Sequence, residues 1–176
     1  MDRWRKYNLI KEKEFFKLRS CLLITLYGSY YPKKEFKYLI KLKNFLISNG
    51  YSATKVVKDY EGDYPTLNSS ELSHRCLEFS DVNFFIVVKS GKNRGIIREL
   101  AFLSDDPNLI YKQDFTVIFE NQNNFSHLSK LTLDDIEKLE IQYRTFTTTT
   151  NLEKMLLAKT FFYLNKLKPK LQMMGT

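Results

Sequence analysis

The fold is decided by the stretch Cys21-Leu22-Leu23-Ile24-Thr25-Leu26-Tyr27-Gly28-Ser29, a continuous apolar run that ends in a glycine and a serine. An apolar run without alternation is typical of a strand buried on both faces of a parallel sheet. From Pro32 onward the apolar residues follow a helical period, and Gly50 comes just after the last of them. Proline suits the first turn of a helix, and glycine suits the position after its end. The first unit of the chain is therefore predicted to be a strand, a loop and a helix.

The same unit recurs along the rest of the chain. We expect further strands over residues 51–57, 82–88, 115–119 and 139–143, and helices over residues 69–79, 95–103 and 151–167. Strands of this composition that alternate with helices are typical of a parallel sheet covered on both faces. Because crossovers between parallel strands are right-handed, few topologies remain. We predict a flavodoxin-like (Rossmann-like) three-layer α/β sandwich with a five-stranded parallel sheet in the order 2-1-3-4-5.

The first 20 residues predict an additional amphipathic helix, which would cover an edge of the sheet or meet a second copy of the chain. Its apolar residues are Leu9, Ile10, Phe15, Phe16 and Leu18. The length of 176 residues, with no low-complexity linker, predicts this helix over residues 1–20 and a single α/β domain over residues 21–176. A homo-oligomer is left open.

Composition argues against several classes of protein. The longest stretch without a charged residue, 20–32, is too short for the roughly 20 residues that cross a bilayer. The N-terminal residues are charged and do not resemble a secretory signal. Two cysteines, Cys21 and Cys76, are too few for a disulfide framework or a four-thiolate zinc site. We expect a reduced, cytoplasmic protein with no membrane partner, no metal and no cofactor.

The chain is basic, with 28 Lys and Arg residues against 20 Asp and Glu residues and a net charge of +8. Such an excess suits a nucleic acid, an anionic small molecule or only a solvated surface. Lysines cluster on the helix that follows Pro32 and near the C-terminus, namely Lys33, Lys34, Lys37, Lys41, Lys43, Lys166, Lys168 and Lys170. Because no recognised nucleic-acid-binding motif accompanies them, the sequence disfavours a nucleic-acid partner without excluding it.

A ligand site is expected at the carboxyl ends of the strands, at the switch point between the first and third strands. The loops there contain glycines, which let backbone N–H groups approach a phosphate or a ribose. Asp59, after the second strand, is expected at the rim. The candidate substrate-binding residues are Tyr27, Gly28, Ser29, Tyr30, Asp59, Ser90, Gly91, Arg94 and Gly95.

Glu99 is the candidate catalytic residue. It lies four residues after Gly95, about one turn into the predicted helix. Because a helix N-terminus favours negative charge, we expect this carboxylate to be ionised. An ionised carboxylate that faces a sugar can act as a nucleophile at the anomeric carbon or stabilise an oxocarbenium-like transition state. The alternative is an ordinary surface glutamate that pairs with Arg98 or Lys92.

Two short motifs carry a resemblance to a known family. Ser80-Asp81-Val82 leads into an apolar strand and is followed by Gly95-Ile96-Ile97-Arg98-Glu99-Leu100-Ala101. This arrangement resembles the nucleoside 2-deoxyribosyltransferase family, in which a strand after an Ala/Ser-Asp pair is followed by Gly-x-x-x-Glu-Leu. Tyr27-Gly28-Ser29 is similar to the strand-and-glycine opening of that family, so the resemblance covers about residues 21–119. The wider superfamily includes nucleotide N-glycosidases, cytokinin-activating phosphoribohydrolases and TIR domains.

The resemblance implies cleavage or transfer at the N-glycosidic bond of a small-molecule nucleotide or nucleoside. Glu99 matches the catalytic glutamate of the family, and Gly28, Ser29 and Gly95 match positions that face the sugar or the phosphate. A further acidic residue that the family has in the preceding helix is not matched, because Glu71 and Glu78 stand at different spacings. The resemblance therefore does not identify the general acid.

Two alternatives stay open. A TIR-like NAD hydrolase would share the order of elements and the glutamate, although Gly95-Ile96 stands where TIR domains usually have Trp-Cys. A non-catalytic nucleotide-binding or sensor module would use the same cleft without turnover. In either case Lys92, Arg94 and Arg98 would suit a phosphorylated ligand.

Overall fold

Five parallel strands form one sheet in the computed structural model, which describes residues 3–88, 94–105, 114–120, 136–137 and 140–174. The strands are β1 (Ile24–Gly28), β2 (Thr54–Val56), β3 (Val82–Val87), β4 (Asp114–Glu120) and β5 (Gln142–Phe146). Their order is β2-β1-β3-β4-β5, and every neighbouring pair is parallel. Ile24 of β1 is in register with Thr54 of β2 and with Val82 of β3. The predicted fold class and strand order are confirmed.

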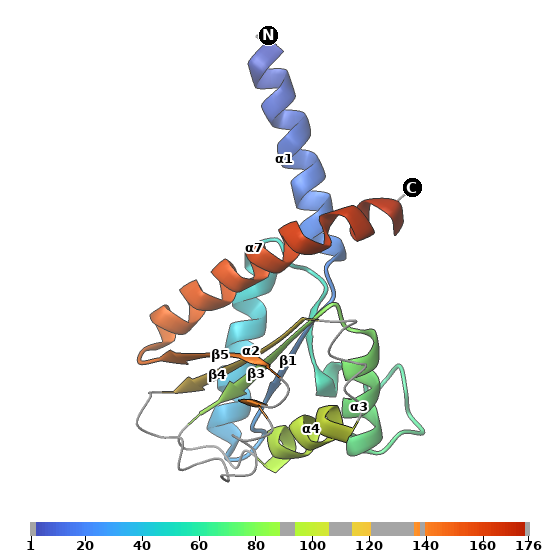
Figure 1. Ribbon diagram of the computed structural model, residues 1–176, viewed down its shortest axis with the longest axis vertical. Helices are drawn as coiled ribbons and strands as arrows, with labels where there is room; N and C mark the ends of the chain where they lie inside the picture. The colour runs from blue at the N-terminus through green and yellow to red at the C-terminus, as the bar shows by residue number, and fades with distance from the viewer. Residues whose placement is uncertain (1–2, 89–93, 106–113, 121–135, 138–139, 175–176) are drawn as a thin grey trace.

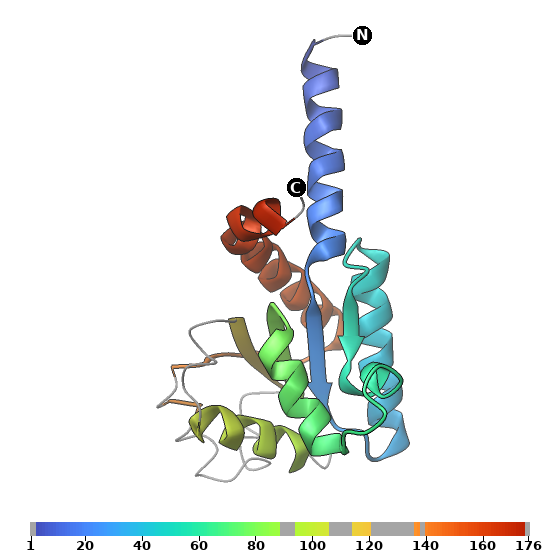
Figure 2. The ribbon, with the colours of Figure 1, turned by 90° about the vertical axis from the view of Figure 1, so that its right-hand side faces the viewer.

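Helices cover both faces of the sheet (Figures 1 and 2). The helices are α1 (Arg3–Cys21), α2 (Lys33–Ser48), the 3₁₀ helix η1 (Val57–Tyr60), α3 (Ser69–Phe79), α4 (Arg94–Asp105) and α7 (Thr149–Met174). One buried cluster joins the sheet to α2 and α7, and a second joins the opposite face to η1, α3 and α4. This arrangement is a three-layer α/β sandwich.

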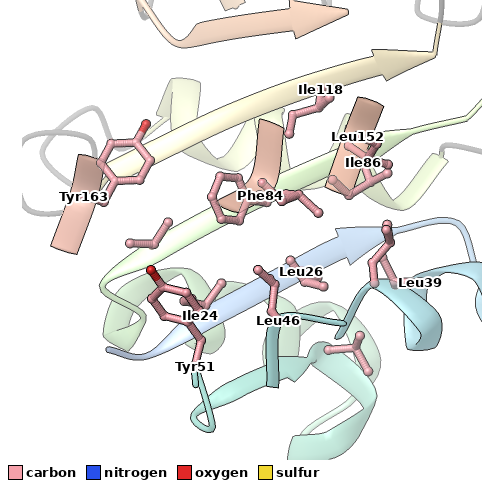
Figure 3. Close-up of a cluster of buried hydrophobic side chains, with 14 of the residues drawn as sticks. Ile24, Leu26, Leu39, Leu46, Tyr51, Phe84, Ile86, Ile118, Leu152 and Tyr163 are labelled. Atoms are coloured by element: carbon pink, nitrogen blue, oxygen red, sulfur yellow. The ribbon is translucent and has the colours of Figure 1, made fainter. Parts of the chain in front are cut away.

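β3 is the centre of both clusters because all six of its residues are buried. Phe84 and Ile86 belong to the cluster with α2 and α7, whereas Phe85 and Val87 belong to the cluster with α3 and α4. This alternation follows from the two-residue period of a strand. Figure 3 shows Phe84 and Ile86 of β3 beside Leu39 and Leu46 of α2 and Leu152 and Tyr163 of α7.

The prediction for the last strand was wrong by about three residues. A strand was expected over residues 139–143, where Leu139 and Ile141 are apolar, but β5 spans Gln142–Phe146. β5 is an edge strand whose first three residues are exposed, so it lacks the apolar run that marks a buried strand. The closing helix was predicted to end before Pro169, but α7 continues through this proline to Met174.

α1 stands away from the rest of the molecule (Figures 1 and 2). Near its C-terminal end Leu18 is buried and Phe15 is partly buried, while Phe16 remains 63% exposed. The helix leads into the start of β1 and crosses α7, and it does not lie along an edge of the sheet. None of the described helices has an apolar stretch long enough to cross a membrane.

Candidate functional site

A cavity of about 350 Å³ opens at the carboxyl end of β1. Its walls come from the loop after β1, from η1, and from the first turns of α3 and α4. The lining residues are Tyr27, Gly28, Ser29, Tyr30, Tyr31, Val57, Lys58, Glu61, Ser69, Ser70, Leu72, Ser73, Gly95, Arg98 and Glu99. The strand order puts this cavity beside the switch point between β1 and β3, where ligands of such sheets bind. Six of the predicted site residues thus come together, namely Tyr27, Gly28, Ser29, Tyr30, Gly95 and Glu99.

Glu99 lies in the second turn of α4 and is partly buried. The hydroxyl of Ser73, in α3, donates a hydrogen bond of 2.6 Å to Oε1 of Glu99. Gly95 lies one turn before Glu99, and a Cβ atom at this position would be 3.6 Å from Oε2. The missing side chain of Gly95 therefore leaves room over the second carboxylate oxygen.

Burial raises the pKa of Glu99 to about 7, although the hydrogen bond from Ser73 and the charge of Arg98 act in the opposite direction. Burial thus opposes the ionisation at neutral pH that was expected from the helix N-terminus. The dipole effect falls off within the first turn, and Glu99 lies beyond it. Desolvation is the larger effect here, and it brings the pKa of Glu99 into the neutral range.

The start of α3 places Ser73 against Glu99. The side chain of Asn68 accepts hydrogen bonds of 3.0 Å from the backbone N–H groups of Ser70 and Glu71. In return, Oε2 of Glu71 accepts a hydrogen bond of 2.9 Å from the backbone N–H of Asn68. This capping box begins the helix at Ser69. Ser73 then lies one turn inside α3 and is 3% exposed.

Neither acidic side chain that the sequence offered in α3 lines the cavity. Glu71 is engaged in the cap, and Glu78 bonds to Arg75 at 2.5 Å. The residue of α3 that reaches Glu99 is instead Ser73, which the sequence analysis missed. The spacing of Ser69, Ser70 and Ser73 just after the capping residue was the available signal, because these positions face the same side of the first turns.

Tyr27 contributes a buried hydroxyl to the cavity wall. The residue is 2% exposed, and its ring stacks on Phe85 with 4.8 Å between the ring centroids. Its hydroxyl finds no hydrogen-bond partner in the described part of the protein. Burial, together with the nearby Cys76 and Glu99, holds the pKa of Tyr27 well above its usual value. The hydroxyl is therefore a neutral donor that a ligand in the cavity could satisfy.

The loop after β1 is held by contacts of its own. A Cβ atom on Gly28 would be 3.0 Å from Cδ1 of Leu39, so the glycine permits close packing of α2 against the end of β1. The hydroxyl of Ser29 donates to the carbonyl of Tyr31 at 2.5 Å and accepts from its N–H at 3.3 Å. The hydroxyl of Tyr30 accepts a hydrogen bond of 3.2 Å from the backbone N–H of Lys58, which ties the loop to η1.

Four predicted binding residues are not part of the described cavity lining. The carboxylate of Asp59 accepts a hydrogen bond of 2.8 Å from the N–H of Val56 and pairs with Lys43 at 3.1 Å, so it stabilises the turn after β2. This corrects its expected place at the rim of the site. Arg94 is exposed at the start of α4 and does not line the cavity. Ser90 and Gly91 lie outside the described residues.

The Ser80-Asp81 pair has a structural role. The hydroxyl of Ser80 bonds to that of Thr25 at 2.6 Å, and Oδ2 of Asp81 accepts a hydrogen bond of 3.1 Å from the N–H of Leu23. These bonds join the start of β3 to the start of β1, at the amino ends of the strands. The pair therefore holds the two central strands together rather than entering the cavity.

The described residues offer no metal centre, since no three His, Cys, Asp or Glu side chains among them could hold a metal ion. Cys76 is buried in α3, and burial raises the pKa of its thiol to about 12, so it remains a protonated packing residue. His74 stacks on Phe102 with 3.8 Å between the ring centroids. Carboxylate, hydroxyl and basic side chains are present in the described lining of the cavity.

Comparison with known proteins adds one result. No protein-family model matches the sequence, and no curated protein matches it. The structure is similar to that of the CMP N-glycosidase BcmB from Clostridium botulinum, with a TM-score of 0.52 and 12% sequence identity. The likeness covers 77% of this chain and 98% of that one. At this identity it establishes that the two proteins share an α/β fold.

Proposed function

We propose that this protein acts on the N-glycosidic bond of a nucleotide or nucleoside, with Glu99 as its catalytic carboxylate. The observation that carries the proposal is the contact between Ser73 and Glu99 at the wall of a cavity of about 350 Å³. A partly buried carboxylate with one oxygen held and the other beside a glycine is suited to meet a sugar carbon. The fold shared with a CMP N-glycosidase supports the same kind of reaction.

The reaction would begin with ionised Glu99. In the covalent route a carboxylate oxygen bonds to the anomeric carbon while the bond from that carbon to the base nitrogen breaks. The electron pair of the broken bond stays on the base, which takes up a proton. The oxygen of water or the nitrogen of a second base then bonds to the anomeric carbon, loses a proton and releases Glu99 as a carboxylate, giving hydrolysis or transfer. In the alternative route Glu99 stabilises an oxocarbenium-like transition state while the base leaves, and water then adds to the anomeric carbon. Both routes need the carboxylate form, so the pKa of about 7 determines their pH dependence.

The cavity favours a phosphorylated ligand. Its volume of about 350 Å³ lies within the range of roughly 300–1,000 Å³ of small-molecule sites. Lys58 and Arg98 line it, and both are exposed and able to meet a phosphate. The unpartnered hydroxyl of Tyr27 would donate to a sugar or phosphate oxygen. We therefore expect a nucleotide to bind more tightly than the matching nucleoside.

Protonation of the leaving base distinguishes two classes of substrate. Glu61 is the one other carboxylate in the described lining, and it is exposed. A pyrimidine or purine base needs a proton as it leaves, whereas nicotinamide leaves NAD as a neutral molecule. The lack of a second buried carboxylate in the described lining therefore favours NAD cleavage as the second candidate function.

The test is release of free base from a panel of substrates. The panel contains the four common nucleoside 5′-monophosphates, the matching nucleosides and NAD, and chromatography measures the base released by the wild type and by Glu99→Gln. We expect release from at least one nucleotide by the wild type and a loss of about 1,000-fold or more in the variant. Nicotinamide release alone would favour the second candidate. Binding without release would indicate a sensor, and no binding of any compound would contradict all of these functions.

A further inference from the structure

The positive charge of the protein is concentrated on two helices. α1 contains seven basic and two acidic residues, and α7 contains five basic residues and one acidic residue. The other residues together contain 16 basic and 17 acidic side chains, so the net charge of +8 comes from α1 and α7. The part of the chain that forms the cavity is close to neutral. A function of the cavity alone does not account for this distribution.

The two basic helices meet away from the cavity. α1 crosses α7, and the rings of Phe15 and Phe161 lie 5.6 Å apart at the crossing (Figures 1 and 2). The C-terminal end of α1 precedes β1, whereas the cavity opens at the carboxyl end of that strand. A partner bound to α1 and α7 would therefore leave the entrance of the cavity open.

Exposed aromatic rings are interleaved with the lysines on both helices. On α1, Phe16 is 63% exposed, and the exposed Lys13 lies one turn before it on the same face, while the exposed Lys17 follows it directly. On α7, Phe162 is 53% exposed, and the ammonium of Lys159 lies 5.7 Å from the centre of its ring. Lys166 lies one turn beyond Phe162, on the same face. Phe161 of α7 is also 47% exposed.

This pattern favours one kind of partner. A second copy of the chain would bring two strongly basic surfaces together, which costs electrostatic energy. A helix that inserts into a membrane surface keeps its apolar face clear of charge, whereas the exposed Lys13 lies on the same face as Phe16. Surfaces that bind single-stranded nucleic acid do interleave aromatic rings with basic side chains, because the bases stack on the rings while the cations contact the phosphates.

We propose that α1 and α7 form a binding surface for single-stranded nucleic acid. Lys13, Lys17, Lys166 and Lys168 contact phosphates, and Phe16, Phe161 and Phe162 provide rings on which bases stack. Sequence analysis disfavoured nucleic acid because no motif accompanies the lysines. The structure adds two observations, the crossing of the basic helices and the exposure of their aromatic rings.

The experiment measures binding of the full chain to fluorescent 20-nucleotide DNA and RNA strands of mixed sequence by anisotropy. We expect a micromolar dissociation constant at 50 mM salt, which weakens at least tenfold at 200 mM salt. A quadruple variant with Lys13, Lys17, Lys166 and Lys168 changed to Gln should bind at least tenfold more weakly. The matched control changes the exposed lysines Lys33, Lys34, Lys37 and Lys41 of α2 to Gln and should lose less than threefold.

Two further comparisons make the test decisive. Phe16→Ala with Phe162→Ala should weaken single-strand binding at least fivefold and leave binding to the matching duplex within twofold. The double variant Lys13→Gln with Lys17→Gln alters only exposed residues of the projecting helix, so its loss of binding cannot come from unfolding of the sheet. Equal losses in the two quadruple variants would overturn the proposal. Tighter binding to phosphatidylserine vesicles than to the DNA or the RNA strand would also overturn it. Base release by the α1 and α7 variants is measured separately and is expected to equal that of the wild type. A failure to bind nucleic acid would therefore leave the proposed role of Glu99 untouched.

Discussion

The hydroxyl of Ser73 donates a hydrogen bond of 2.6 Å to Oε1 of Glu99, joining two residues that are 26 positions apart in sequence. The bond connects the first turns of α3 to α4 across the wall of the cavity. It also favours the ionised form of a carboxyl group whose pKa burial raises to about 7. Ser73 is therefore a positioning residue that adjusts the charge of Glu99 as well as its orientation.

Replacing Ser73 with alanine should move the pH profile of catalysis upward. Removal of the hydroxyl raises the pKa of Glu99 further, because the hydrogen bond stabilises the charged form. A hydrogen bond to a charged group contributes about 1.5–3 kcal/mol, so we expect a loss of about tenfold in kcat at pH 6. The loss should be smaller at pH 8.5, where the carboxyl ionises in both proteins. Rate measurements from pH 5.5 to 9 on Ser73→Ala and on the rescue variant Ser73→Thr check this, and an unchanged profile would exclude the role of Ser73.

Replacing Glu99 with glutamine should stabilise the folded protein at high pH. The folded-state pKa of about 7 lies above the ordinary value of 4.5, so the wild type loses stability as the pH rises through this interval. At pH 8 the cost of the buried charge reaches up to about 3 kcal/mol, and Glu99→Gln avoids it. Near pH 4 the two proteins should have equal stability. Urea unfolding at pH 4 and pH 8 measures the difference, with the exposed Glu14→Gln as control. Equal stability at pH 8 would show that Glu99 is not desolvated.

Tyr27→Phe should separate ligand binding from stability. The hydroxyl of Tyr27 is buried without a partner in the described part of the protein, so its removal should leave stability unchanged or raise it by about 1 kcal/mol. A ligand that accepts this hydrogen bond should bind about tenfold more weakly. Tyr163→Phe is the matched control, because its hydroxyl bonds to Thr116 at 2.6 Å inside the core. That control should lose about 1 kcal/mol of stability and keep its affinity. Calorimetric titration and urea unfolding give both quantities, and unchanged affinity in Tyr27→Phe would remove Tyr27 from the binding site.

Gly95→Ala should fold well and lose activity. Its Cβ atom would be 3.6 Å from Oε2 of Glu99, which is an ordinary van der Waals distance. Alanine in a helix is more favourable than glycine by up to about 1 kcal/mol, so stability should not fall. The new methyl group covers the carboxylate oxygen, and kcat should fall at least tenfold. Gly28→Ala should behave differently, since its Cβ atom at 3.0 Å from Leu39 costs about 1 kcal/mol or more of stability. Full activity in Gly95→Ala would contradict the proposed approach to Glu99.

The central strands could be predicted from the sequence because they are buried on both faces. β1 and β3 carry uninterrupted apolar runs, and the strand order follows from right-handed crossovers. β5 could not be placed in this way, because an exposed edge strand has no comparable run. Its partner strand, rather than its own composition, determines where it lies.

The meeting of Tyr27, Gly95 and Glu99 could also be predicted, since topology brings the end of β1 to the start of α4. Ser73 was missed, because the serines after the capping residue of α3 indicate a polar helix face but not that one of their hydroxyls contacts Glu99. Asp59 follows the second strand as a rim residue would, but η1 turns the chain and its carboxylate bonds to Val56. Such local hydrogen bonds are decided by the fold and not by the order of the elements.

The most direct measurement of the central claim is base release by wild type and Glu99→Gln from the nucleotide that the wild type cleaves fastest, at pH 8 and saturating concentration. Calorimetry on the same samples measures whether the variant still binds that nucleotide. The account predicts binding within about threefold of wild type and a rate at least about 1,000-fold lower, because the amide cannot act as the carboxylate does. Undiminished base release by Glu99→Gln would contradict it.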